Sequence, residues 1–250
     1  MKLATKLRIV VLVGAVALVE GLCRVGIIKA FTMIPPSEMA LSLWRLIAAG
    51  KVHGDMVRTL TAVGIALASA IVVGAAAGAV IHALPRVRRT VDPLLAAYYS
   101  VPVFVFYPMF IVMLGLNDRP KIMIGFLYAV AAMTINTLNG LDRVAPVLRK
   151  TARVLRLDPV TTALRVVLPC AAPYLFTGVK LAIAYSFIGV VGSEFILSTG
   201  GLGYQIGFAY HDFNNRTMYA LILFILTVVM AINMSLHAWE KMLLARRGLH

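Results

Sequence analysis

The chain has 250 residues, of which 61% are hydrophobic and only 14% are charged, with a mean hydropathy of +0.90. A soluble globular chain is nearer half apolar and about a quarter charged, so the composition excludes an ordinary soluble domain. The net charge of +14 would suggest nucleic acid as a partner of a soluble protein. Here, Lys and Arg lie between apolar stretches, without the single basic patch and interleaved aromatic residues of a nucleic-acid site, so we expect no nucleic-acid partner.

Apolar blocks of about twenty residues recur along the chain, and this is the length that crosses a lipid bilayer as a helix. In lipid every backbone polar group needs a partner within the protein, and these blocks lack the alternation of barrel strands. We therefore predict an all-α integral membrane protein, with one transmembrane domain over residues 1–250 and about six spanning helices. The predicted helices cover residues 9–28, 56–84, 94–116, 122–138, 172–197 and 218–240.

The N-terminal residues imitate a signal peptide, because Met1–Arg8 is basic and Ile9–Val19 is apolar. No small-x-small cleavage motif follows, so we interpret this segment as a retained first helix. Lys and Arg are more frequent in the loops on the same side as the N-terminus, such as Arg86–Arg89 and Arg143–Arg165, than in the other loops. The positive-inside rule then places both termini in the cytoplasm.

The cytoplasmic loop over residues 139–171 is long for a connector, since most connections need only a few residues. Apolar residues recur at helical spacing over 145–158, which predicts a short helix there. Asp158-Pro159 is expected to end it, because a residue before proline avoids the helical region. A second short helix is expected over Val160–Leu168, stopping at Pro169. This much ordered chain on one side of a membrane predicts a docking surface for another protein.

The sequence contains no catalytic or nucleotide-binding motif that we can identify. It has no G-x-x-x-x-G-K-[ST] phosphate loop and no Cys/His cluster at metal-ligand spacing, and two cysteines are too few for a disulfide scaffold. Gly200-Gly201-Leu202-Gly203 is interpreted as an outside turn. We therefore expect a protein that is not an enzyme, holds no metal or cofactor of its own, and depends on a partner for any use of ATP.

Polar residues within the predicted spans are candidates for a translocation path or gate, because such groups face protein or water rather than lipid. The alternative for Ser, Thr and Asn is hydrogen bonding between helices, and Glu194 could instead brace the turn at Gly200-Gly201. Gly74 and Gly78 predict a close helix contact. The candidate path residues are Tyr98, Tyr99, Ser100, Pro102, Asn136, Asn139, Ser186 and Glu194.

The cytoplasmic loop resembles the loop of ABC-importer permeases, which reads Glu-Ala-Ala, three residues, Gly, nine residues, Ile-x-Leu-Pro. Val166-Val167-Leu168-Pro169 matches the end of this pattern, Lys150-Thr151-Ala152 stands at the Glu-Ala-Ala positions, and Arg156 stands at the glycine position. Because Arg156 lacks the backbone freedom of glycine, we expect the turn at Asp158-Pro159 instead.

The resemblance extends along nearly the whole chain and is greatest to nitrate-, sulfonate- and taurine-type permeases. Tyr98 to Pro108 follows their third-helix pattern without gaps, and Glu194 with Gly201-Leu202-Gly203-Tyr204 matches their closing section. Each motif alone is weak, but their order and spacing together are specific. The likeness implies the type I ABC importer permease fold in the plasma (inner) membrane of a bacterium.

The resemblance also implies that the loop helix is a coupling helix, seated on a separate ATP-binding cassette ATPase subunit that holds ATP and Mg. Val154 and Leu155 would pack in its groove while Arg149, Lys150 and Arg153 pair with acidic groups; alternatively, these basic residues only follow the positive-inside rule. The residues assigned to coupling are Arg149, Lys150, Thr151, Ala152, Arg153, Val154, Leu155, Arg156 and Asp158.

Other expected partners are an extracytoplasmic solute-binding protein and a second permease copy, with a homodimer favoured and a heterodimer open. The solute would be a small organic anion such as a sulfonate, or nitrate, with heterocyclic vitamin precursors as a further option. A secondary transporter driven by an ion gradient is the main alternative, and a membrane scaffold is a third. A secondary transporter should show an internal repeat and buried carboxylates, which the sequence does not display.

Overall fold

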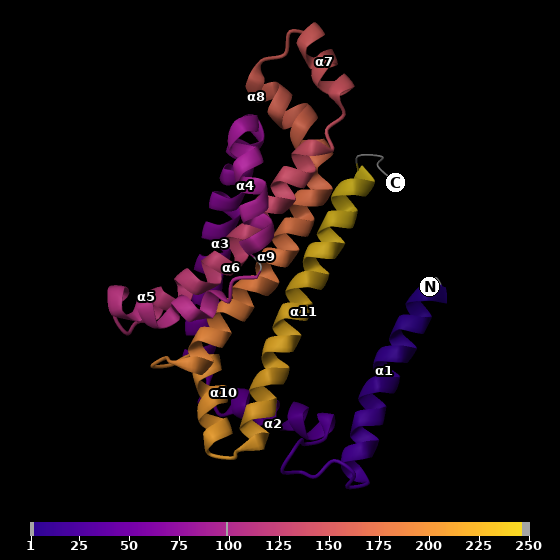
Figure 1. Cartoon of the computed structure of the whole chain (residues 1–250). Coiled ribbons are helices and arrows are strands. Elements are labelled where there is room, and N and C mark those ends of the chain that lie inside the picture. Colours follow the sequence, from indigo (N-terminus) through magenta and orange to yellow (C-terminus); the bar gives the residue numbers. More distant parts are fainter. Residues whose placement is uncertain (1–2, 99, 247–250) are drawn as a thin grey trace. The chain divides into compact units, whose positions relative to one another are not determined.

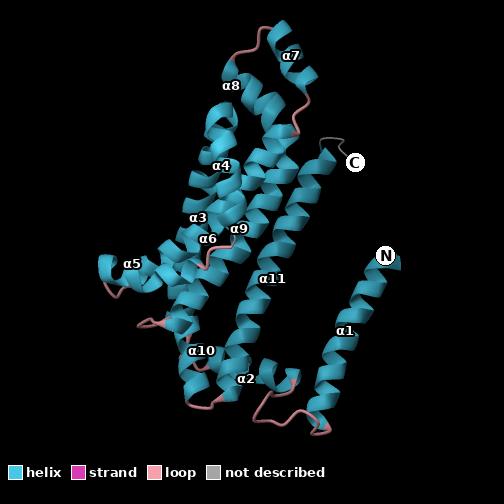
Figure 2. Ribbon diagram, viewed as in Figure 1, coloured by secondary structure: helices cyan, strands magenta, loops and turns pink. Residues whose placement is uncertain are grey.

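The structure, a computed structural model, describes residues 3–98 and 100–246 (Figure 1). Within these ranges it contains helices and loops and no strand, as Figure 2 shows. The helices are α1 (Leu3–Arg24), α2 (Pro36–Ala48), α3 (His53–Ala83), α4 (Pro85–Tyr98), the 3₁₀ turn η1 (Val103–Phe106), α5 (Tyr107–Leu114), α6 (Asp118–Asp142), α7 (Pro146–Val154), α8 (Pro159–Thr162), the π-helical η2 (Ala163–Val167), α9 (Leu168–Ile196), α10 (Leu202–His211) and α11 (Asn215–Arg246).

The chain divides into two compact units, each built from two stretches of sequence. One comprises residues up to Arg58 together with Glu194–Val228, and the other comprises Thr59–Ser193 together with the chain from Val229 onward. The boundaries fall within α3, α9 and α11, so each of these helices contributes to both units.

Four of the described helical segments are long and apolar enough to cross a membrane, and a fifth follows if α4 and the η1–α5 segment form one bent span. The four are His53–Ala83, Asp118–Asp142, Pro159–Ile196 and Asn215–Met242. The helical membrane architecture expected from the sequence is confirmed. The segment Pro159–Ile196 joins α8, η2 and α9 into one run, so Pro169 does not end a helix as expected.

The helical run continues through Pro169 because the hydrogen bonding before this proline departs from the regular α-helical pattern. A proline lacks an N–H and its ring crowds the carbonyl four residues earlier, which breaks a regular α-helix. Here, η2 directly precedes Pro169 and its wider π-turn locally replaces the α-helical pattern. The predicted loop over 139–171 is correspondingly shorter, since its last part belongs to the long run and its first residues belong to α6.

The range 94–116 also differs from the single helix expected there. In the structure α4 ends at Tyr98, and a break precedes η1 and α5. Pro102 lies in this break with an extended ψ of 88°, and Pro108 stands in the first turn of α5, where its missing N–H costs nothing. The prolines were expected only to loosen the hydrogen bonding of one helix. In the structure the helix is interrupted between Tyr98 and Val103.

Glycines set the distance between neighbouring helices in the second unit. A Cβ on Gly74 of α3 would lie 2.7 Å from the Cβ of Met133 on α6, and one on Gly78 would lie 2.7 Å from that of Thr137. The predicted close contact at Gly74 and Gly78 is therefore confirmed. The same principle joins α6 to α9, where a Cβ on Gly189 would lie 2.6 Å from the Cα of Gly125.

This last contact gives a prediction about stability. Gly189→Leu should lower the stability of the folded protein by at least about 1–3 kcal/mol, because backbone rather than a flexible side chain occupies the space. Thermal unfolding of the purified protein in detergent measures the effect. Gly64→Leu is the matched control, because a Cβ on this α3 glycine meets no atom within 4 Å. Equal melting temperatures for the two variants would refute the proposed α6–α9 contact.

Candidate functional site

The coupling region is built around α7, a nine-residue helix that begins with Pro146 at its first position. One side of α7 is anchored, since Ala152 is 2% exposed. Val147 and Val154 on the opposite side are 67% and 81% exposed, and Leu155, the residue that caps α7, is 64% exposed. Apolar groups gathered in this way on a short helix are typical of a surface that another protein covers. The predicted apolar docking residues Val154 and Leu155 are thus exposed.

The turn that ends α7 lies at Arg156, not at Asp158-Pro159 as expected. Arg156 has a φ of 53°, in the left-handed region that favours glycine. Its N–H donates to the carbonyl of Arg153 at 3.0 Å, and the N–H of Leu157 donates to the carbonyl of Ala152 at 3.0 Å. These two bonds form a Schellman motif, in which the residue after the helix cap takes a left-handed conformation. Arg156, at the glycine position of the importer pattern, therefore has a backbone conformation that favours glycine.

Asp158 serves a local structural purpose in the next helix. Its carboxylate accepts the N–H of Thr161 at 2.9 Å and so caps the first turn of α8. Hydrogen bonds from the Thr161 side chain and backbone hold the pKa of the Asp158 carboxyl below its usual value. Pro159 follows at the first helical position, where a proline is well accommodated. Together these residues restart the helix immediately after the Arg156 turn.

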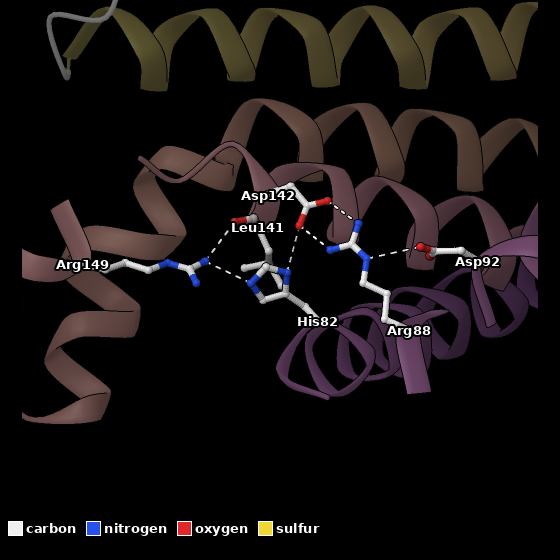
Figure 3. A network of polar contacts seen from close by, with 6 residues as sticks. All are labelled: His82, Arg88, Asp92, Leu141, Asp142 and Arg149. Atoms are coloured by element: carbon white, nitrogen blue, oxygen red, sulfur yellow. Dashed lines mark hydrogen bonds and ion pairs between the residues drawn. The ribbon is translucent and has the colours of Figure 1, made fainter. Parts of the chain in front are cut away.

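Arg149 is held within the chain by a polar network shown in Figure 3. Its Nη2 donates to the carbonyl of Leu141 at 2.9 Å and lies 3.0 Å from Nε2 of His82. The other imidazole nitrogen, Nδ1, lies 3.0 Å from Oδ1 of Asp142. Arg149 is partly buried, whereas Lys150 and Arg153 on the same helix are exposed. Of the basic residues expected to contact a partner, Arg149 is already engaged with α3 and the end of α6.

Asp142 is the centre of this network and joins helices that are distant in sequence. Its two carboxylate oxygens accept a bidentate pair from Arg88 of α4, with distances of 2.6 Å and 2.5 Å, while His82 of α3 approaches from another side. Arg88 also contacts Asp92 at 3.5 Å. Bidentate arginine–carboxylate pairs fix orientation as well as distance. The ends of α3, α4 and α6 and the start of α7 therefore meet at one polar junction.

The described path candidates within the spans are buried or hydrogen-bonded inside the chain. Asn136 is 9% exposed and its amide donates to the carbonyl of Ala132 at 2.8 Å, one turn earlier in α6, so this bond lies within one helix and is not the contact between helices considered above. The hydroxyl of Tyr98 donates to the carbonyl of Leu127 at 2.8 Å. Ser186 is fully buried, and its hydroxyl has no partner among the described residues.

The remaining path candidates lie at the surface of the second unit or outside the description. Ser100 and Pro102 are exposed, and Asn139 is exposed beside a cavity of about 320 Å³ that Arg88 and Asp92 also line. Tyr99 lies outside the described residues. Among the path candidates, Asn139 thus lines this cavity, and Glu194 lines another of about 210 Å³.

Glu194 belongs to the other unit, where it stabilises the start of α10. It is 1% exposed, and its Oε2 accepts the N–H of Gly203 at 3.0 Å, in the first turn of that helix. A carboxylate at a helix N-terminus is favoured by the unpaired N–H groups and by the helix dipole. Gly201 has a φ of 111°, and a Cβ there would overlap the Glu194 carboxylate. The bracing alternative for Glu194 beside Gly200-Gly201 is the one that these contacts support.

Further side chains tie the same turn to the start of α3. The N–H of Gly201 donates to Oδ1 of Asp55 at 2.6 Å, and the amide of Gln205 donates to Oδ2 at 2.8 Å. Arg58 donates to the hydroxyl of Thr199 at 3.0 Å. The sequence interpretation did not include Asp55, Arg58 or Gln205. For Asp55 and Arg58 the available sequence signal is a charge beside an apolar span, whereas the neutral Gln205 gives no such signal.

A second ionic contact was also missed from the sequence. Lys180, within α9, pairs with Glu240 of α11, and Nδ1 of His237 lies 3.2 Å from the same carboxylate oxygen. The side chains of Lys180 and Glu240 are 26% and 13% exposed. Charged groups in membrane helices usually pair, so a lone Lys180 in a span was the available signal.

These features define a class: a helical membrane protein with a short helix that exposes apolar side chains beside a polar junction. The fold is similar to that of the MetNI methionine ABC transporter in inward-facing conformations, with a TM-score of 0.63 and 20% identity over 74% of this chain and 92% of the other. Residues 70–248 match the family described as "Binding-protein-dependent transport system inner membrane component". The chain belongs to this family, which comprises permeases of ABC importers.

Curated relatives agree with this assignment. The chain is 26% identical to the taurine transport system permease protein TauC of Escherichia coli (strain K12), over 86% of this chain and 74% of TauC. It is 27% identical to the nitrate import permease protein NrtB of Leptolyngbya laminosa, over 70% of this chain and 63% of NrtB. It is 28% identical to the putative aliphatic sulfonates transport permease protein SsuC of Bacillus subtilis (strain 168), over 76% and 69% of the two chains.

The Arg156 turn gives a prediction that separates backbone strain from lost contacts. A left-handed conformation costs a side-chain-bearing residue roughly 1–2 kcal/mol relative to glycine. Arg156→Gly should therefore strengthen the turn and slow amide exchange of Leu157 by about five-fold or more, since 1.4 kcal/mol corresponds to ten-fold. Arg156→Val should accelerate exchange, because a β-branched residue fits this conformation worst. Faster exchange in the glycine variant would contradict the assigned turn.

The turn before α10 gives a second prediction, about the Glu194 carboxylate. Gly201→Ala should destabilise the protein by more than about 1 kcal/mol, because it combines an unfavourable φ with an overlap. Gly26→Ala is the control, since Gly26 also has a positive φ of 83° but a Cβ there meets no atom within 4 Å. Thermal unfolding in detergent compares them. A loss in the Gly201 variant no larger than in the Gly26 variant would show that Glu194 does not occupy this position.

Proposed function

We propose that the chain is the translocation subunit of an ATP-driven importer and that α7 is its coupling helix, seated on a separate ATP-binding subunit. The observation that carries the proposal is the exposed apolar face of α7, formed by Val147, Val154 and Leu155, in the loop where the importer pattern is found. Large apolar side chains gain free energy when a partner covers them, about 25 cal/mol per Å² of apolar area removed from water. ATP with Mg would be bound by that partner.

Exposed basic residues surround the same face. Lys150, Arg153 and Arg156 lie on or next to α7 and are exposed. An apolar centre with a charged rim is the usual composition of a specific protein interface. We therefore assign the contact with acidic groups of the ATP-binding subunit to these three residues. Arg149 is not included, because it is hydrogen-bonded to Leu141 and contacts His82.

The position of α7 fixes the proposed orientation in a bacterial inner membrane. If α7 meets an ATP-binding subunit, then α7 is cytoplasmic, and the excess of Lys and Arg on that side places both termini there as well. The turn at Gly200-Gly201 would then face outward, where an extracytoplasmic solute-binding protein delivers the solute. A second copy of the chain would complete the path, as a homodimer by preference, with a heterodimer as the other possibility.

The solute we propose is a small organic anion such as a sulfonate, or nitrate. Support comes from the relatives named for taurine, aliphatic sulfonate and nitrate transport. Uptake of labelled taurine, an alkanesulfonate and nitrate into proteoliposomes containing the complete complex would test this, with methionine as a comparison. ATP-dependent uptake of none of the three anions would overturn the solute class. Uptake by this chain alone, driven by an ion gradient, would favour the secondary-transporter alternative.

The coupling surface gives a prediction of its own. Val154→Asp combined with Leu155→Asp should abolish co-purification of the ATP-binding subunit, because two buried carboxylates in the groove would lack partners. The matched control is Val25→Asp, at another strongly exposed valine (77%) that lies outside α7. Both variants should still insert into the membrane. Retention of the ATP-binding subunit by the double variant would refute the docking role of α7.

A further inference from the structure

We propose that His82 is a positioning residue of the transport cycle, which transmits movement of α7 to α3, α4 and α6. The inference rests on the proposed function, because it assumes that α7 is moved by an ATP-binding subunit. Its structural basis is the chain of contacts from Arg149 through His82 and Asp142 to Arg88 (Figure 3). Each contact in this series joins two different helices.

The contacts of His82 indicate which imidazole nitrogen accepts a hydrogen bond and which one donates. The guanidinium of Arg149 can only donate hydrogen bonds, so Nε2 of His82 must be the acceptor at 3.0 Å. The remaining proton is then on Nδ1, which donates to Oδ1 of Asp142 at 3.0 Å. The imidazole thus connects a donor on α7 to an acceptor on α6. The charged groups facing it are Arg149, Asp142 and, through Asp142, Arg88.

The hydrogen bond between Arg149 and His82 is the contact in this network that movement of α7 would break and re-form. One nitrogen, Nη2, serves both Leu141 and His82, whereas Nε is buried with no partner among the described residues. A buried donor without an acceptor is unfavourable, so exposing Nε of Arg149 to water would offset part of the free energy lost with its hydrogen bonds. The bidentate pair between Arg88 and Asp142 has both oxygens satisfied and is the fixed part. Movement of α7 would thus act on His82 while α4 and α6 stay joined.

Transmission of movement from α7 to α3 requires a side-chain contact, because the two helices are not adjacent in sequence. His82 and Arg149 are separated by 67 positions, and His82 and Asp142 by 60. The chain joins α6 to α7 only through residues 143–145, and nothing covalent joins α7 directly to α3. The imidazole therefore gives α7 a direct polar contact with α3. The first turn of the same helix carries Asp55, which accepts the N–H of Gly201.

The first test measures the position of α7 and needs neither ATP nor a known solute. Spin labels at Val147→Cys on α7 and Val80→Cys on α3, in a chain with Cys23 and Cys170 replaced by alanine, report one distance in lipid nanodiscs. We expect a narrow distribution for the parent protein and for His82→Gln, whose amide also offers one acceptor and one donor. His82→Leu should broaden it, and Arg153→Leu, at the exposed arginine of α7, should not. An unchanged distribution in His82→Leu would overturn the proposal.

The second test measures coupling in the complete complex. In proteoliposomes, His82→Leu should raise the ATP hydrolysed per solute imported several-fold, while His82→Gln restores the parent ratio. A structural role alone would lower total activity without changing this ratio, so an unchanged ratio would also overturn the proposal. If the parent complex imports none of the tested anions, the proposed solute class fails, whereas the distance measurement still decides whether His82 positions α7.

Discussion

The carboxylate of Asp142 is the contact on which the junction of α3, α4, α6 and α7 in the second unit depends. It terminates α6 and accepts hydrogen bonds from Arg88 of α4 and His82 of α3, and Arg149 of α7 reaches the same imidazole. Helices in a membrane gain little from the hydrophobic effect against one another, so packing and polar contacts must specify their arrangement. Without this carboxylate, two arginines and a histidine would converge with no anion between them.

The other unit uses a carboxylate in a comparable way. Glu194 and Asp55 both accept backbone N–H groups at the start of α10, and Gly201 leaves the space that the Glu194 side chain fills. Within the second unit, the helices pack through glycine, as at Gly125 and Gly189. The chain thus combines smooth, closely packed helix centres with polar connections at their ends. Such helices can shift against one another while their ends determine which helices move together.

The apolar pattern was sufficient to predict the helical membrane fold, the contact at Gly74 and Gly78, and a short helix with Val154 and Leu155 outward. It could not place the turn at Arg156, because a left-handed residue other than glycine has no sequence signal. It could not show that Arg149 contacts His82, which lies too far away in sequence to be recognised as a neighbour. The pair of Lys180 and Glu240 was missed for the same reason. In each case residue type was informative, whereas long-range neighbours required the structure.

The central claim is that α7 is a cytoplasmic docking helix for an ATP-binding subunit. Labelling of a single cysteine at position 154 with a membrane-impermeant thiol reagent tests it directly, in cells and in inverted membrane vesicles. The account predicts labelling only in inverted vesicles stripped of the ATP-binding subunit, and protection when that subunit is bound. Labelling in intact cells, or equal labelling with and without the subunit, would contradict it.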